Sequence, residues 1–264
     1  MTSLAASRPA GHAHAHVAPT RATGPVAGAL RAGRFVGSVL EGFLTVELAH
    51  RRGGEEAARR AFADVARELG SLLGVRVHVR GKLEAHHEVR VANHTSYLDI
   101  LAIASIDGGR FLSMHEVAAW PLVGRVARNI GTLFVDRASA SGRAAALRAL
   151  STAVAQGAPL LVFPEGRTAK RRLLPFKRGA FSVARQAGVP VRPLALRWSD
   201  VEAAAWIDDM TLPPHLWARL CGPTLDVVVE VLPSVPTRGR TPLDVSHEVR
   251  GALARALELA EDAA

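Results

Sequence analysis

Short runs of β-branched and apolar residues alternate along most of this chain with longer segments in which apolar residues recur at helical spacing. The short runs predict strands at Val75–Arg80, Val89–Ala92, Arg110–Ser113, Thr132–Val135, Leu160–Phe163, Val191–Leu196 and Val227–Val231. The amphipathic segments predict helices at Ser96–Ile106, Val117–Arg128, Ala138–Gln156, Gly179–Ala187 and Ser246–Glu261. Such alternation is typical of an α/β fold, so we expect a mostly parallel sheet of about seven strands covered by helices on both faces.

The first quarter of the chain has a different pattern, which divides the sequence into three parts. Residues 1–24 are rich in Ala, Pro and His without periodicity and predict a disordered tail. Residues 25–74 predict two helices, joined by a turn at Gly53 and Gly54 and ended by Gly74. Residues 75–264 make up the predicted α/β domain.

The first of the two N-terminal helices carries apolar residues that suit a lipid surface. Phe35, Val39, Phe43 and Val46 fall near one face, and arginines flank the segment. Its uncharged stretches are shorter than the ~20 residues that a membrane-spanning helix needs. Two interpretations stay open: a helix that lies in the membrane interface, and an amphipathic helix that packs on the domain.

The net charge of the chain favours anionic partners but does not distinguish one class of anionic partner from another. The 264 residues carry 33 Lys and Arg against 24 Asp and Glu, which gives a net charge of +9. Such an excess favours an anionic membrane, a phosphorylated or acidic substrate, or nucleic acid. A single cysteine, Cys221, excludes an internal disulfide and is typical of a reducing compartment.

The stretch VANHTSYLD, residues 91–99, holds the first candidate for chemistry. His94 follows a predicted strand and precedes a predicted helix, at the sheet edge where α/β proteins bind ligands. An imidazole there can accept a proton from a hydroxyl, and the Asp99 carboxylate can orient the ring and stabilise its charged form. Ser96 and Asp99 also have the spacing of a capping box, so this stretch alone suits capping as well as catalysis.

Two further motifs place charged groups just past predicted strands. GTLFVDR ends in Arg137, whose guanidinium suits a phosphate or a carboxylate. VFPEGRTA places Glu165 and Arg167 on either side of Gly166 in a sharp turn. A basic run that continues to Arg178 suits anion steering, although a solvated basic loop explains it equally well.

The fourth motif, GVPVRPLAL, opens a strand with the rigid Pro190. In their order and spacing, the four motifs resemble those of the glycerophospholipid acyltransferases, specifically the 1-acylglycerol-3-phosphate acyltransferases. The resemblance covers about residues 69–232. It implies transfer of an acyl group from acyl-CoA or acyl-carrier protein to the hydroxyl of 1-acyl-glycerol-3-phosphate, giving phosphatidic acid, with no metal or organic cofactor. It also implies an enzyme on the cytoplasmic face of the membrane, docked through its two N-terminal helices.

The same resemblance assigns roles to single residues. It implies that His94 is the general base and that Asp99 orients it. The residues that it associates with binding of the acceptor and its phosphate are Arg137, Glu165, Gly166 and Arg167. The residues expected to support the site are Asn93, Ser96, Phe134 and Pro190.

One departure from the family pattern keeps the acceptor open. Members of the family often carry a Lys where this chain has Met114, and the loss of a cation weakens the case for a phosphate. An acceptor without phosphate, such as a lyso-ornithine lipid, is therefore an alternative. Charge alone would also suit a basic protein that binds lipid or nucleic acid, but the sequence carries no signature of a nucleic-acid-binding fold.

Overall fold

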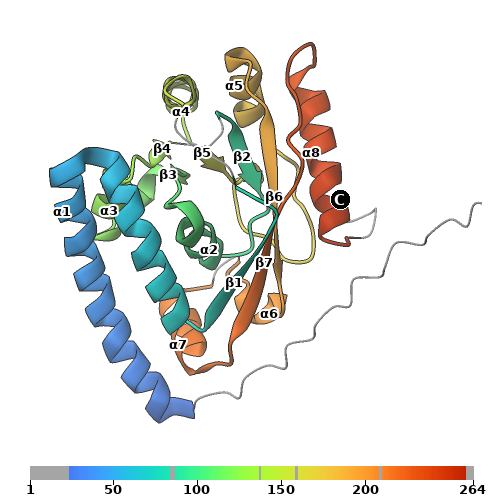
Figure 1. Cartoon of the computed structure of the whole chain (residues 1–264). Helices are drawn as coiled ribbons and strands as arrows, with labels where there is room; N and C mark the ends of the chain where they lie inside the picture. Colours follow the sequence, from blue (N-terminus) through green and yellow to red (C-terminus); the bar gives the residue numbers. More distant parts are fainter. Residues whose placement is uncertain (1–23, 84–86, 137, 158–159, 208–209, 260–264) are drawn as a thin grey trace, which may run out of the picture.

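The computed structural model describes residues 24–83, 87–136, 138–157, 160–207 and 210–259, so the predicted tail lies almost wholly outside the described residues. Its strands are β1 Val75–Arg80, β2 Val89–Ala92, β3 Leu112–Met114, β4 Leu133–Val135, β5 Leu160–Val162, β6 Val191–Trp198 and β7 Leu225–Val231. Its helices are α1 Gly24–Leu72, α2 Leu98–Asp107, the 3-10 helix η1 His115–Ala119, α3 Val123–Asn129, α4 Ala140–Ala155, α5 Gly179–Ala187, α6 Val201–Ala204, α7 Leu212–Cys221 and α8 Pro242–Ala256. The predicted α/β fold is confirmed (Figure 1).

Five strands form the main sheet, in the order β1-β7-β6-β2-β5. The pairs β1–β7, β6–β2 and β2–β5 are parallel, and β6–β7 is antiparallel. The carboxyl ends of β6, β2 and β5 therefore meet at one edge of the sheet. The first and third motifs follow β2 and β5, so the topology brings them together at this edge.

The expectation of one sheet of about seven strands was wrong in its arrangement. β3 and β4 form a separate parallel pair, and a single bridge between Phe111 and Leu161 links them to β5. The break follows from the shortness of β5, because Pro164 comes two residues after its end and has no N–H to extend a ladder. The second motif, which follows β4, belongs to this smaller sheet.

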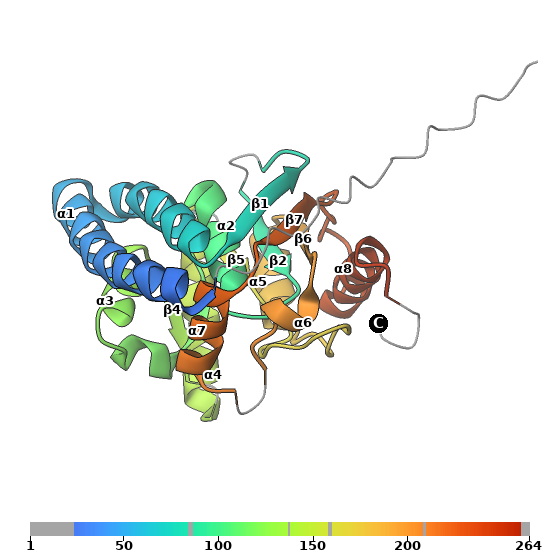
Figure 2. The same ribbon diagram turned by 90° about the horizontal axis from the view of Figure 1, so that it is seen from below.

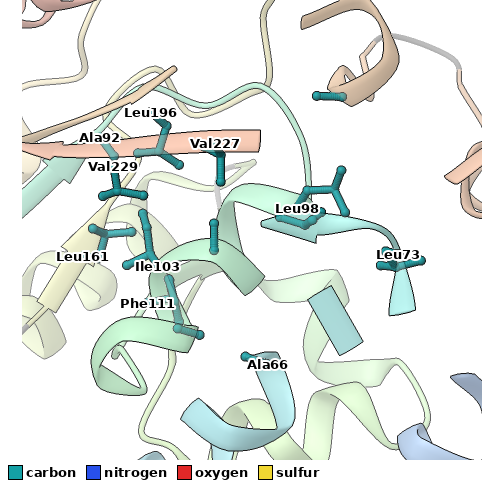
Figure 3. Close-up of a cluster of buried hydrophobic side chains, with 14 of the residues drawn as sticks. Ala66, Leu73, Ala92, Leu98, Ile103, Phe111, Leu161, Leu196, Val227 and Val229 are labelled. Atoms are coloured by element: carbon teal, nitrogen blue, oxygen red, sulfur yellow. The ribbon is translucent and has the colours of Figure 1, made fainter. Parts of the chain in front are cut away.

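Helices cover both faces of the main sheet, and each face has its own core (Figures 1 and 2). Side chains alternate between the two cores along the strands: Ala92 and Leu161 face one, while Val91 and Val162 face the other. Figure 3 shows the first core, where Ile103 of α2 and Leu73 pack with Val227 of β7. Burial on both faces explains why the central strands read as nearly continuous apolar runs.

Two predicted helix boundaries were displaced for local reasons. The helix expected over Val117–Arg128 is divided into η1 and α3, because Pro121 lies between them and cannot donate a helical hydrogen bond. The last helix begins four residues earlier than expected, at Pro242. There Thr241 and Asp244 form a capping box and the proline occupies the first turn.

The predicted N-terminal helical pair is present as the two halves of α1, which kink at Gly53 and Gly54 as expected. The face proposed for lipid contact was wrong, because Val46 is fully buried and Phe35 packs against the first core. Gly42 lies against Val65 of the second half, which leaves no room for a larger residue. The outer face of the first half is exposed instead. Among the described residues, no helix is long and apolar enough to cross a membrane.

Candidate active site

His94 lies just past the carboxyl end of β2, in the turn that leads into α2. Its Nδ1 lies 2.9 Å from Oδ2 of Asp99, the second residue of α2. Asp99 is fully buried, whereas the His94 side chain keeps 16% of its exposure. With Nδ1 donating its N–H to the carboxylate, the neutral imidazole keeps Nε2 as its proton acceptor.

The Asp99 carboxylate has further partners that fix its place. Oδ2 also accepts the backbone N–H groups of Thr95 and Ser96, at 2.6 and 2.8 Å. Oδ1 accepts the indole N–H of Trp198, at 2.9 Å. The capping interpretation holds in part, because the Asp99 carboxylate accepts the Ser96 N–H while the Ser96 hydroxyl binds Leu98 instead of Asp99. The catalytic interpretation stays a prediction.

An aromatic ring from the neighbouring strand fixes the other side of the imidazole. The rings of His94 and Phe163 are stacked, with centroids 3.8 Å apart and planes at 12°. Phe163 directly follows β5. The stacked ring and the carboxylate together restrict the orientation of the imidazole.

Glu165 holds the backbone of His94 rather than its ring. Its Oε1 accepts the His94 N–H at 3.0 Å, and its Oε2 accepts the Leu174 N–H at 2.8 Å. The residue is 4% exposed, and this burial raises the pKa of the Glu165 carboxyl to about 7 despite the two hydrogen bonds. The Ala169 N–H donates to the His94 carbonyl at 2.8 Å, so the loop after β5 binds both polar groups of the His94 backbone.

Of the four residues predicted to support the site, two lie close to His94 in the chain and two lie in other parts of the fold. Asn93 is buried and bridges two strands, since its amide donates to the Leu196 carbonyl and accepts the Leu196 N–H. The Ser96 hydroxyl accepts the N–H of Leu98 at 2.9 Å. Phe134 lies half-buried in β4 of the smaller sheet. Pro190 precedes β6, at the opposite edge of the sheet from His94, where its carbonyl accepts the Val89 N–H.

The predicted acceptor-binding residues gather only in part. Gly166 has a φ of 76°, in the left-handed region that favours glycine, and a Cβ there would also displace the Lys177 ammonium, which would lie 2.6 Å away. Arg167 is exposed beside it. Arg137 lies outside the described residues. The roles of Arg137, Glu165, Gly166 and Arg167 in acceptor binding stay predictions.

Two cavities adjoin this site. The first, of about 280 Å³, is lined by His94, Glu165 and Trp198 together with three arginines, Arg171, Arg172 and Arg197. The second, of about 320 Å³, is lined by Arg167, Lys170, Arg172 and apolar Leu174 and Ile207. Ala169 and Arg172 line both, so the basic loop separates them.

Sequence reasoning missed Phe163 and Trp198 as members of the site. Both stand at the carboxyl ends of strands, β5 and β6, which border β2 in the sheet. A buried indole requires an acceptor for its N–H, and a Trp at the end of a predicted strand is a signal of this kind.

The arrangement can remove a proton from a bound hydroxyl. A positioned imidazole backed by a buried carboxylate is suited to general base catalysis. In the described part of the chain, no three His, Cys, Asp or Glu side chains gather to hold a metal ion. The expectation that the reaction needs no metal or cofactor stays a prediction.

Comparison with known proteins gives consistent matches. Residues 74–197 match the family described as Acyltransferase. A lyso-ornithine lipid O-acyltransferase of Pseudomonas aeruginosa is 33% identical over 195 residues, which cover 72% of this chain and 75% of that protein. A 1-acyl-sn-glycerol-3-phosphate acyltransferase of Neisseria meningitidis serogroup B is 33% identical over 173 residues, 62% of this chain and 68% of that protein.

A solved structure shares the fold. The crystal structure of the 1-acyl-sn-glycerophosphate acyltransferase PlsC from Thermotoga maritima matches with a TM-score of 0.64. The match covers 86% of this chain and 96% of that one, at 22% identity. At this identity the likeness establishes the common architecture.

Proposed function

The chain belongs to the acyltransferase family, as its motifs predicted, and we propose that it transfers a fatty acyl group from a thioester to the hydroxyl of a lysolipid. The observation that carries this proposal is the contact between His94 and the buried Asp99. In the proposed reaction, Nε2 of His94 takes the proton of the acceptor hydroxyl while its oxygen attacks the thioester carbonyl. The carbon–sulfur bond then breaks, and the thiolate leaves with the proton that His94 returns.

The acceptor that we propose is 1-acyl-glycerol-3-phosphate, with phosphatidic acid as the product. Relatives in Neisseria meningitidis and in humans are named for this reaction. The donor is an acyl thioester, either acyl-CoA or acyl-carrier protein, used as a co-substrate. Both substrates bind together, so no acyl-enzyme intermediate is required.

A lyso-ornithine lipid is the second candidate acceptor, and two observations favour it. Met114, 37% exposed, stands where the family often has a Lys. Several relatives, including those in Pseudomonas aeruginosa and Brucella abortus, are named for lyso-ornithine lipid.

We also propose that the protein docks on the cytoplasmic face of the membrane through α1. Large apolar side chains are exposed along the first half of this helix, at Val26, Leu30, Val36, Leu40, Leu44 and Leu48. Their spacing places them on one face, opposite the face that packs on the domain. A lipid surface would cover this face and present the lysolipid to the enzyme. The excess of basic residues favours an anionic membrane over nucleic acid as the partner.

A thiol-release assay tests the reaction. The purified full-length protein in detergent receives an acyl-CoA and either 1-acyl-glycerol-3-phosphate or lyso-ornithine lipid, and the assay is repeated with acyl-carrier protein as donor. Release with one acceptor identifies the head group, and we expect His94→Ala to remove it while thermal unfolding is unchanged. Full activity of His94→Ala would refute the proposed base, and no release with any pair would refute the reaction.

Co-sedimentation with anionic vesicles tests the docking. Leu44→Glu places a charge on the exposed face of α1 and should release the protein from the vesicles. Leu243→Glu is the control, because Leu243 is an exposed leucine outside α1, on α8, at 43% against 64% for Leu44. Equal binding of the two variants would contradict docking through α1.

A further inference from the structure

The loop after β5 carries three consecutive cations, and α6 neutralises two of them. The Lys170 ammonium and the Arg171 guanidinium both pair with the carboxylate of Glu202. The Arg171 contact is 3.0 Å long. Among the described residues, the Arg172 side chain has no hydrogen-bond or ion-pair partner. Figure 2 shows the loop beside α6.

The backbone of this turn is held in an uncommon conformation. Arg171 has a φ of 55°, in the left-handed region that residues other than glycine rarely adopt. Such conformations persist only where surrounding contacts impose them, and they cluster at functional sites. The ion pair with Glu202 is one such contact.

Within the residues that the structure describes, one cation that lines the cavity beside His94 has no ion-pair partner. Of the three arginines that line it, Arg171 is paired with Glu202 and Arg197 with Glu258, at 2.8 Å. Arg172 is the third, and it also borders the second cavity. A guanidinium is an effective partner for a phosphate or carboxylate because it can donate two parallel hydrogen bonds.

The position of Arg172 is coupled to the catalytic histidine. Glu165 joins the His94 N–H to the Leu174 N–H, and the Ala169 N–H binds the His94 carbonyl. These bonds hold the loop on both sides of Arg172, from residue 169 to residue 174. The fold thus sets the distance between the backbone of His94 and the backbone of Arg172.

We propose that Arg172 binds the anionic head group of the acceptor lysolipid, as a second contact besides Arg167. This assignment rests on the proposed function. In 1-acyl-glycerol-3-phosphate the phosphate lies only a few bonds from the reactive hydroxyl, and the carboxylate of a lyso-ornithine lipid lies nearly as close to its own. In acyl-CoA, the pantetheine arm separates the phosphates from the thioester. A cation in the same cavity as His94 therefore matches the acceptor rather than the donor.

Direct binding separates this proposal from the proposed reaction, since binding needs no turnover. Short-chain 1-acyl-glycerol-3-phosphate, lyso-ornithine lipid and acyl-CoA are each titrated into the full-length protein by calorimetry. The variants are Arg172→Gln, Arg172→Lys and the control Arg178→Gln. Arg178 belongs to the same basic loop but lines neither cavity, so its removal reports the general loss of one charge.

We expect Arg172→Gln to weaken binding of an acceptor about 10- to 100-fold, as for the loss of a charged hydrogen bond. Arg172→Lys should recover part of this affinity, and Arg178→Gln should stay within about twofold of the wild type. The assignment is overturned if Arg172→Gln and Arg178→Gln bind the acceptors equally, if the loss is confined to acyl-CoA, or if the wild type binds neither acceptor. Failure of the proposed reaction would instead leave acceptor binding intact without thiol release.

Discussion

Asp99 and Glu165 are two buried carboxylates that bind the same histidine, yet they accept different numbers of hydrogen bonds. Asp99 accepts four N–H groups: those of the His94 ring, two backbone amides and the Trp198 indole. Glu165 accepts only the backbone N–H groups of His94 and Leu174. With two donors, hydrogen bonding does not offset the loss of solvation, and the pKa of Glu165 rises to about 7.

The difference gives the two carboxylates different roles: Asp99 acts on the imidazole ring, and Glu165 acts on the position of the backbone. Asp99 contacts the imidazole itself, so its charge acts on the ring that moves the proton in the proposed reaction. Glu165 contacts only the backbone, so it fixes where the ring and the following loop lie. A change at Asp99 should therefore reduce the rate, whereas a change at Glu165 should alter the dependence of stability on pH.

The largest effect is expected for Asp99→Asn. The amide must leave one of the four donors unmatched, and it removes the charge that stabilises the imidazolium. We expect the rate of thiol release to fall about 10²- to 10⁴-fold, the range contributed by a positioned acid–base group. Single-turnover kinetics at saturating acceptor measures this rate.

Binding provides the control for that variant. The affinity of Asp99→Asn for the acceptor, measured by calorimetry, should stay close to that of the wild type, because Asp99 is fully buried and lines neither of the two cavities. A rate within about threefold of the wild type would show that the ring needs no carboxylate.

A smaller effect, on stability, is expected for Glu165→Gln. The pKa of Glu165 in the fold is about 7, above its ordinary value of 4.5, so the folded state holds the proton more tightly than the unfolded chain. This stabilisation is present in full below pH 4.5 and is lost as the pH rises to about 7. The shift corresponds to about 3 kcal/mol of unfolding free energy.

Urea unfolding at pH 5 and pH 8 measures this contribution as a difference between proteins. The glutamine side chain does not titrate, so the variant should lose about 2.5 kcal/mol less than the wild type between these pH values. Other titrating groups cancel in the comparison. Parallel pH curves for the two proteins would show that the Glu165 carboxyl is ionised throughout.

The sequence predicted the part of the site that depends on strand ends. His94 and Glu165 both follow short apolar runs, and parallel strands bring such positions to one edge. It did not predict Trp198, which is 99 residues from Asp99, because the adjacency of β6 and β2 is a property of sheet order and not of local pattern. The same limit explains why one expected sheet is divided into two.

In the N-terminal helix, the sequence pattern did not show which of two apolar faces is buried. Its first half has two apolar stripes, one through Phe35 and Val46 and one through Leu40 and Leu44. Helical periodicity identifies both, but tertiary packing decides which is buried. Contact between α1 and the rest of the fold, as at Gly28 against Cys221, selects the first stripe for the interior.

An intermediate effect is expected for Trp198→Phe, which removes one of the four donors to Asp99. The phenyl ring can fill most of the indole site, but Oδ1 of the buried carboxylate loses its partner. We expect a loss of about 2 kcal/mol in unfolding free energy, since the bond involves a charged acceptor. Activity should fall less than in Asp99→Asn, because the bond from His94 to Oδ2 remains. A loss of activity equal to that of Asp99→Asn would show that the indole, and not the charge, positions the ring.

The smallest effect is expected for Ser96→Ala, which separates closure of the helix start from orientation of the ring. The Ser96 hydroxyl accepts the Leu98 N–H and forms no hydrogen bond with the His94 ring or Glu165, which have other partners among the described residues. Its loss should cost about 1 kcal/mol of unfolding free energy, as for other helix-start acceptors, and leave the rate nearly unchanged. Thermal unfolding and thiol release measured on the same sample test both halves of this expectation. If the rate fell as far as in Trp198→Phe, the backbone geometry at the start of α2 would be needed to orient the imidazole. Asp99 would then affect the ring through its bonds to that backbone as much as through its charge.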